Sequence, residues 1–157
     1  MAYAGEGSLP ASASQRAPVA DGIVLDGFTV SWLPDGIGSM VSNFEYEWED
    51  VSFRTQVWES GPDADGGYQT DLNILVLRGE KLRDIESLHS YLADYQERDP
   101  RQWHLERFEH DDHPGYHGDD QAFWLAAPGV GVVVKVYGDR FDRDDVIDVV
   151  GGMHELR

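Results

Sequence analysis

The sequence predicts an α+β fold, in which a twisted antiparallel sheet of about six to seven strands carries two helices packed on one face. Apolar residues alternate with polar ones along several short segments, which is the period of a half-buried strand. Two other segments, residues 84–95 and 141–153, repeat apolar residues at the helical spacing of three and four positions. Short connections rich in Gly, Pro and Asp separate the strand segments, which favours antiparallel pairing.

The length of 157 residues fits a single domain. Residues 1–20 are rich in Ala, Ser, Gly and Pro and show no apolar period, so we expect a flexible leader there. The α+β domain is expected over residues 22–157. The start of the chain lacks the basic and apolar parts of a signal peptide. The expected location is therefore cytoplasmic if the chain is complete, and extracytoplasmic if a signal segment has been removed.

The first half of the chain predicts a meander of strands. The opening strand is expected at residues 27–33. The clearest alternation is at residues 44–49, where aromatic residues occupy one face and Glu45, Glu47 and Glu49 the other. Strands at residues 51–58 and 68–77 follow, and the acidic segment 61–67 makes the turn between them.

The second half adds the helices and further strands. Ile85, Leu88, Leu92 and Tyr95 form one apolar stripe on a helix over residues 84–95. A strand is expected at residues 103–108, a polar loop at 110–120, and two strands within 121–137 around a Pro-Gly turn. A closing helix over residues 141–153 would begin near an Asp cap and end at a pair of glycines.

Charge and composition exclude several classes of function. Thirty acidic and 12 basic residues give a net charge of -18, which repels nucleic-acid phosphates and anionic membranes. No apolar run reaches the length of about 18 residues that a membrane helix needs, so we expect no membrane insertion. There is no cysteine and no G-x-S-x-G motif, and we expect a non-catalytic protein.

The alternating glutamates offer a docking face for a partner. Alternation points Glu45, Glu47 and Glu49 to solvent, where they would contact a basic protein or peptide or remain a solvated face. Trp58 shares its side of the next strand with Arg54 and Gln56, so we expect it on the more polar face. These glutamates and Trp58 are the predicted partner-binding residues.

The segment 110–117 contains the only local cluster with the chemistry of a metal site. His110, His113 and His117 supply imidazole nitrogens among several aspartates, a donor set that suits Zn²⁺, Ni²⁺ or Cu²⁺. Pro114 and Gly115 interrupt any helix that would align the three imidazoles. The alternatives are an exposed acidic connection and adventitious metal binding.

Short motifs carry a weak resemblance to a known group of domains. The sequence has Trp32-Leu-Pro-Asp-Gly36 at the opening strand, His113-Pro-Gly115 before Phe123-Trp-Leu125, and a closing helix. Over about residues 28–153 this order resembles the small α+β domains of unknown function in extracytoplasmic lipoproteins and in the outer parts of anti-sigma regulators. The resemblance implies a binding or sensory role that faces the cell envelope.

Three functions are consistent with these observations. The first is a protein- or peptide-binding regulatory module that uses the open, acidic face of the sheet. The second is an acidic inhibitor or immunity-type protein that neutralises a cationic toxin or enzyme. The third is a metal-binding protein that uses the histidines of segment 110–117.

Overall fold

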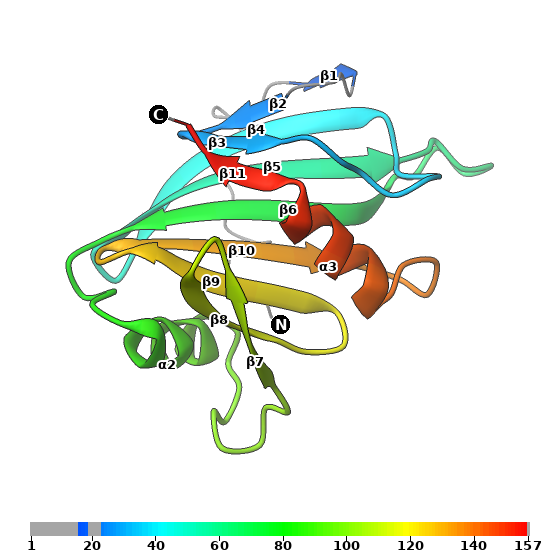
Figure 1. Cartoon of the computed structure of the whole chain (residues 1–157). Coiled ribbons are helices and arrows are strands. Elements are labelled where there is room, and N and C mark those ends of the chain that lie inside the picture. The colour runs from blue at the N-terminus through cyan, green and yellow to red at the C-terminus, as the bar shows by residue number, and fades with distance from the viewer. Residues whose placement is uncertain (1–15, 19–22, 157) are drawn as a thin grey trace.

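The computed structural model describes residues 16–18 and 23–156 of the chain (Figure 1). Its elements, in chain order, are β1 (Arg16–Pro18), β2 (Ile23–Leu25), β3 (Phe28–Val30), β4 (Met40–Trp48), β5 (Val51–Ser60), β6 (Gln69–Arg78), α2 (Ile85–Tyr95), β7 (Glu106–His110), β8 (His113–His117), β9 (Gln121–Ala127), β10 (Val130–Val136), α3 (Arg143–Gly151) and β11 (Met153–Glu155). The predicted α+β class is confirmed. Neither helix of the described residues has the length and apolar character needed to cross a membrane.

Eight strands form the main sheet, in the order β1-β4-β5-β6-β10-β9-β8-β7, and every pair of neighbours is antiparallel. A separate three-stranded sheet has the order β11-β3-β2 and joins the C-terminal strand to the first strands of the domain. The main sheet is thus larger than the expected six to seven strands. Its extra edge strand, β1, comes from the segment expected as a leader, and the rest of that segment lies outside the described residues.

Both faces of the main sheet are apolar. In β6, Ile74 and Val76 belong to one buried cluster, whereas Leu75 and Leu77 belong to a second cluster on the opposite face. Alternation along the strand therefore buries both sets of side chains, as in a sheet that is covered on both sides. Two apolar faces require two covering layers.

Helix α2 covers the face that carries Leu75 and Leu77. Asp84 caps its start and accepts hydrogen bonds from the backbone N–H and the hydroxyl of Ser87, both at 2.7 Å. The apolar stripe of α2 packs with Leu75 and Leu77 in one cluster. Gly131 permits this close approach, because a Cβ atom there would lie 2.8 Å from Cδ1 of Leu88. The helix predicted at residues 84–95 is confirmed.

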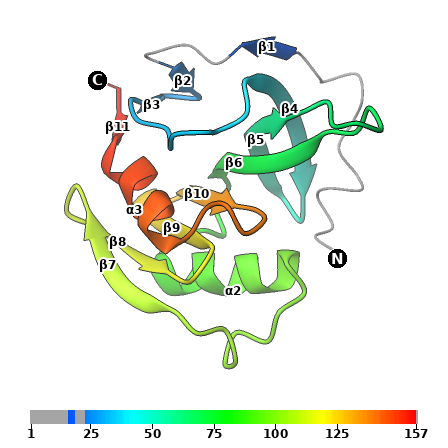
Figure 2. The same cartoon turned by 90° about the vertical axis from the view of Figure 1, so that its right-hand side faces the viewer.

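Helix α3 and the small sheet cover the opposite face (Figure 2). Asp142 and Asp145 form a capping box at the start of α3, and Val146 and Val149 pack into the same cluster as Ile74 and Val76. The expectation that both helices share one face is wrong, and so is the expectation of an open acidic face. The apolar character of β6, β9 and β10 on both sides requires cover for each face.

The segment expected as a loop, residues 110–120, contributes a strand instead. Strands β7 and β8 form a hairpin at the edge of the sheet. Gly115 faces the backbone oxygen of Phe123, which would lie 2.5 Å from an added Cβ atom, so only glycine allows β8 to approach β9. Pro114 pairs with Glu109 and lies outside the register that joins β8 to β9, where its missing N–H is not required.

Candidate functional site

The tip of the β7–β8 hairpin is a two-residue turn made of Asp111 and Asp112. Their φ angles are 52° and 68°, and the flanking residues His110 and His113 are paired in the register. Two positive φ angles are typical of a type I′ turn, which matches the twist of a hairpin and accepts Asp. Residues that pair directly across two strands lie on one face. The turn therefore places two imidazoles on one face of the hairpin and two carboxylates at its tip.

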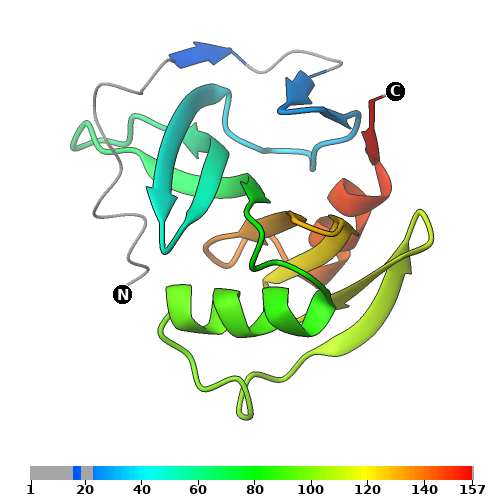
Figure 3. The ribbon, with the colours of Figure 1, turned by 90° about the vertical axis from the view of Figure 1, so that its left-hand side faces the viewer.

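The C-terminal strand reaches the same place from the other sheet (Figure 3). Helix α3 ends at Gly151, and β11 then pairs with β3, with His154 opposite Thr29. Met153 is fully buried, and its backbone oxygen accepts a hydrogen bond of 2.6 Å from Nε2 of His110. Since successive side chains of a strand alternate, His154 points away from the core that holds Met153.

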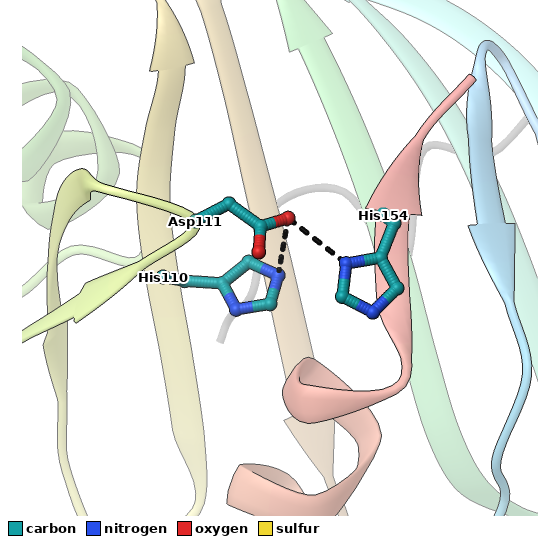
Figure 4. Close-up of side chains that lie close together, drawn as sticks. All are labelled: His110, Asp111 and His154. Atoms are coloured by element: carbon teal, nitrogen blue, oxygen red, sulfur yellow. Dashed lines mark hydrogen bonds and ion pairs between the residues drawn. The ribbon is translucent and has the colours of Figure 1, made fainter. Parts of the chain in front are cut away.

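His110, Asp111 and His154 come together at this contact (Figure 4). Nδ1 of His154 donates to Oδ2 of Asp111 at 2.9 Å, and Nε2 of His110 lies 3.6 Å from the same oxygen. The two imidazole rings are stacked, with centroids 5.6 Å apart and an interplanar angle of 28°. One nitrogen or oxygen of each residue lies within 4.8 Å of the other two. We refer to these three residues as the His110–Asp111–His154 cluster.

The cluster is partly buried. The His110 side chain is 10% exposed and lies edge-on to the Trp124 ring, whereas Asp111 and His154 are 48% and 54% exposed. The hydrogen bond from His154 holds the pKa of Asp111 below its ordinary value; slight burial opposes this effect, and the neighbouring histidines support it. The Asp111 side chain is therefore a carboxylate at neutral pH and has the charge that a cation site requires.

The cluster forms one wall of a cavity of about 390 Å³. The lining residues are Phe28, His110, Asp111, Asp112, His113, Trp124, Ala126, Met153, His154 and Glu155. They come from the hairpin, from β9 and from the small sheet. The cavity thus lies where the two sheets meet.

Imidazole nitrogens and a carboxylate oxygen are ligands for Zn²⁺ and its neighbours among the transition metals. Metal–ligand bonds of about 2.0–2.2 Å in a tetrahedron separate the donor atoms by about 3.4 Å. The two contacts of Asp111, at 2.9 and 3.6 Å, bracket that value. The imidazole nitrogens of His110 and His154 would have to move closer together to bind one ion. Because the His154 side chain is exposed, it can make this movement. His110 would exchange its hydrogen bond to Met153 for the metal.

The sequence prediction of His110, His113 and His117 as a metal trio is only partly matched. His110 and His113 both line the cavity. His117 pairs with Glu106 at the far end of the hairpin, and its ring contacts Phe108. Four residues of extended strand separate His113 from His117 by about 13 Å. A single ion therefore cannot join all three, and His117 is not part of the site.

His154 is the residue that the sequence analysis missed. The closing helix was predicted to end at residue 153, and no element was predicted for His154, which follows it. In the sequence, 43 positions separate His154 from Asp111. The two glycines before Met153 end the helix and allow a new strand. This was the one local signal that a further element carries His154.

The predicted partner-binding residues divide into two groups. Glu45, Glu47 and Glu49 are exposed, as their alternation indicates, and Glu45 forms an ion pair of 3.1 Å with Arg54. Trp58 is fully buried in the cluster beneath α3 and the small sheet. The expectation that Trp58 lies on a polar face and contacts a partner is wrong, because the small sheet and its loops bury that end of the face.

Comparison of the chain with protein-family models, curated proteins and solved structures gives no match. The resemblance to lipoprotein and anti-sigma domains stays a prediction. So does the binding of a protein or peptide by the exposed glutamates. The geometry of the His110–Asp111–His154 cluster is therefore the basis for a proposal about function.

Proposed function

We propose that the protein binds one divalent transition-metal ion, with Zn²⁺ as the first candidate, through His110, Asp111 and His154. The observation that carries the proposal is the placement of three metal-ligand groups from two sheets within 4.8 Å on the wall of a cavity. The proposal keeps His110 from the trio expected from the sequence, and it replaces His113 and His117 with Asp111 and His154.

The backbone of the turn places the Asp111 carboxylate at the cluster. Type I′ turns favour Asn or Asp at the first central position and glycine at the second, because both positions have positive φ. Asp111, with φ of 52°, follows this preference, and Asp112, with φ of 68°, occupies the position where glycine is usual. The turn therefore holds the Asp111 carboxylate at the cluster in a backbone conformation that Asp accepts.

The donor set also selects the kind of cation. Ca²⁺ prefers six to eight oxygen ligands, and Mg²⁺ prefers an octahedron of oxygens. Two imidazoles and one carboxylate instead suit Zn²⁺, Ni²⁺ and Cu²⁺. The net charge of -18 raises the local concentration of any cation near the surface. We therefore expect binding of Zn²⁺ and its neighbours, and much weaker binding of Ca²⁺.

Calorimetric titration of the tag-free, chelator-treated protein tests the proposal. We expect one equivalent of Zn²⁺ to bind with micromolar or tighter affinity. The His154→Ala variant should lose at least tenfold in affinity. The matched His117→Ala variant, which removes a histidine from the same hairpin but outside the cluster, should bind as the unmodified protein does. Equal losses in both variants, or no stoichiometric binding, would refute the proposal.

A further inference from the structure

Strand β7 is a free edge of the main sheet. It stands last in the order of the eight strands, and β8 is its one pairing partner among the described residues. The strand lies at the border of the molecule (Figure 2). An edge strand presents unpaired backbone N–H and C=O groups, to which another strand can add. The five residues of β7 include no proline, and their register with β8 has no bulge, so nothing in the strand itself prevents such pairing.

The backbone groups that point outward belong to Arg107 and Glu109. In the hairpin of β8 and β9, the N–H of Gly118 donates to the backbone oxygen of Gln121 at 2.8 Å. Hydrogen-bonded pairs alternate along antiparallel strands, so Tyr116, two positions before Gly118, directs its N–H and C=O to β9. Arg107 lies opposite Tyr116 and therefore directs its own backbone groups to the free edge. Glu109, two positions further on, does the same.

The side chains of β7 form a pattern that is complementary to itself. Arg107 and Glu109 carry opposite charges on either side of Phe108, and both are exposed. When two copies of the strand pair antiparallel about a two-fold axis at Phe108, Arg107 of one copy lies opposite Glu109 of the other. Each such pair can also exchange two backbone hydrogen bonds, because both residues direct these groups to the edge. The backbone and the charges thus favour the same register.

The other registers are unfavourable. An axis at Arg107 places this residue opposite its own copy, and an axis at Glu109 does the same with two carboxylates. Like charges directly opposite each other destabilise a sheet. An axis between two residues would pair outward backbone groups with inward ones, which cannot form hydrogen bonds. Charged residues on an edge often prevent pairing, but the alternation of sign in β7 permits one register.

We propose that β7 binds a second copy of this chain, and that the two main sheets join through antiparallel pairing of residues 106–110. Arg107 already lies 3.7 Å from Glu86 of its own chain, but its side chain is 63% exposed and stays open to a partner. The net charge of -18 opposes association, and salt at about 0.15 M limits the range of this repulsion to about 8 Å. The pairing uses backbone groups of the strand and does not require the metal site.

Sedimentation velocity in about 0.15 M salt tests the inference, and EDTA in the buffer keeps the result independent of the proposed metal binding. Between about 10 μM and 1 mM, the range of weak complexes, the unmodified protein should pass from monomer to dimer. Arg107→Glu and Glu109→Arg each place like charges opposite each other, so each variant should stay monomeric where the unmodified protein is dimeric. Circular dichroism checks that both variants are folded.

Two further samples test the register itself. An equimolar mixture of Arg107→Glu and Glu109→Arg should form a heterodimer, because every pair then joins opposite charges. The double variant, which exchanges the two charges within one chain, should dimerise as the unmodified protein does. An unmodified protein that stays monomeric up to about 1 mM overturns the inference. So do single variants that dimerise undiminished, or a mixture and a double variant that both stay monomeric.

Discussion

The carboxylate of Asp111 accepts a hydrogen bond of 2.9 Å from Nδ1 of His154, although 43 positions separate the two residues in the sequence. Asp111 lies at the tip of the edge hairpin of the main sheet, and His154 lies on the C-terminal strand of the small sheet. This contact joins the two sheets and forms the centre of the proposed metal site.

The two aspartates of the turn provide a matched pair of variants. Asp111→Asn and Asp112→Asn each remove one negative charge, and asparagine accepts the positive φ of both positions. We expect Asp111→Asn to weaken Zn²⁺ binding at least tenfold, because the amide is a poorer ligand than the carboxylate. Asp112→Asn should change the affinity only a few-fold through the lost charge. Calorimetry measures both, and equal losses would show that charge rather than coordination dominates.

Cu²⁺ should quench the fluorescence of Trp124. The Trp124 ring lies edge-on to His110 with their centroids 4.8 Å apart, so an ion bound to His110 would lie close to the indole. We expect one equivalent of Cu²⁺ to remove the emission of this tryptophan among the five of the chain. Zn²⁺, whose d shell is full, should not quench. Trp124→Phe should abolish the quenched component, and persistent quenching in that variant would place the ion elsewhere.

Metal should stabilise the fold, since the ion would link the hairpin to the C-terminal strand. Free Zn²⁺ at a hundred times the Kd contributes about 2.7 kcal/mol when it binds only the native state. For a chain of this size, that corresponds to a rise in Tm of roughly 5–10 °C. EDTA should reverse the rise, as followed by circular dichroism. A rise of the same size in His154→Ala would contradict binding at the cluster.

The start of α2 gives a prediction about pH. Hydrogen bonds from the hydroxyl and the backbone N–H of Ser87 hold the pKa of Asp84 below its ordinary value of 3.8. A lowered pKa in the folded state adds stability above the ordinary pKa, and this stability is lost as the pH falls through the folded value. We therefore expect Asp84→Ala to lower Tm at pH 7. The difference from the unmodified protein should shrink as the pH falls below the ordinary pKa value of 3.8.

The control for this pH effect is Asp84→Asn. Asparagine is also a good N-cap and keeps an acceptor oxygen, so it should lower Tm less than alanine does at pH 7. If the three proteins show the same differences in Tm at pH 7 and at low pH, ionisation of Asp84 does not contribute to the stability of the helix.

Local patterns in the sequence predict much of the fold but not how its layers are arranged. Two predicted patterns match the structure: the apolar stripe of Ile85, Leu88 and Leu92, and the alternation around Glu45 and Glu47. Each pattern depends only on residues within a single helix or strand. The arrangement of the helices on opposite faces was missed. The continuous apolar runs in β9 and β10 were the available signal, since strands buried on both faces lose their alternation.

The sequence predicted only part of the candidate site. His110 and Asp111 stand out because histidines and aspartates are dense in one segment. His154 enters only through the pairing of β11 with β3, which depends on contacts across the whole chain. His117 appeared equivalent to His113 in the sequence, but the extended strand between them separates the two imidazoles.

The most direct test of the proposed metal site is a crystal structure of the Zn²⁺-loaded protein with anomalous difference density measured at the zinc edge. We predict one strong peak bound by imidazole nitrogens of His110 and His154 and a carboxylate oxygen of Asp111. A zinc peak at His117, a peak bound only by surface carboxylates, or no peak at full zinc saturation would contradict the proposal.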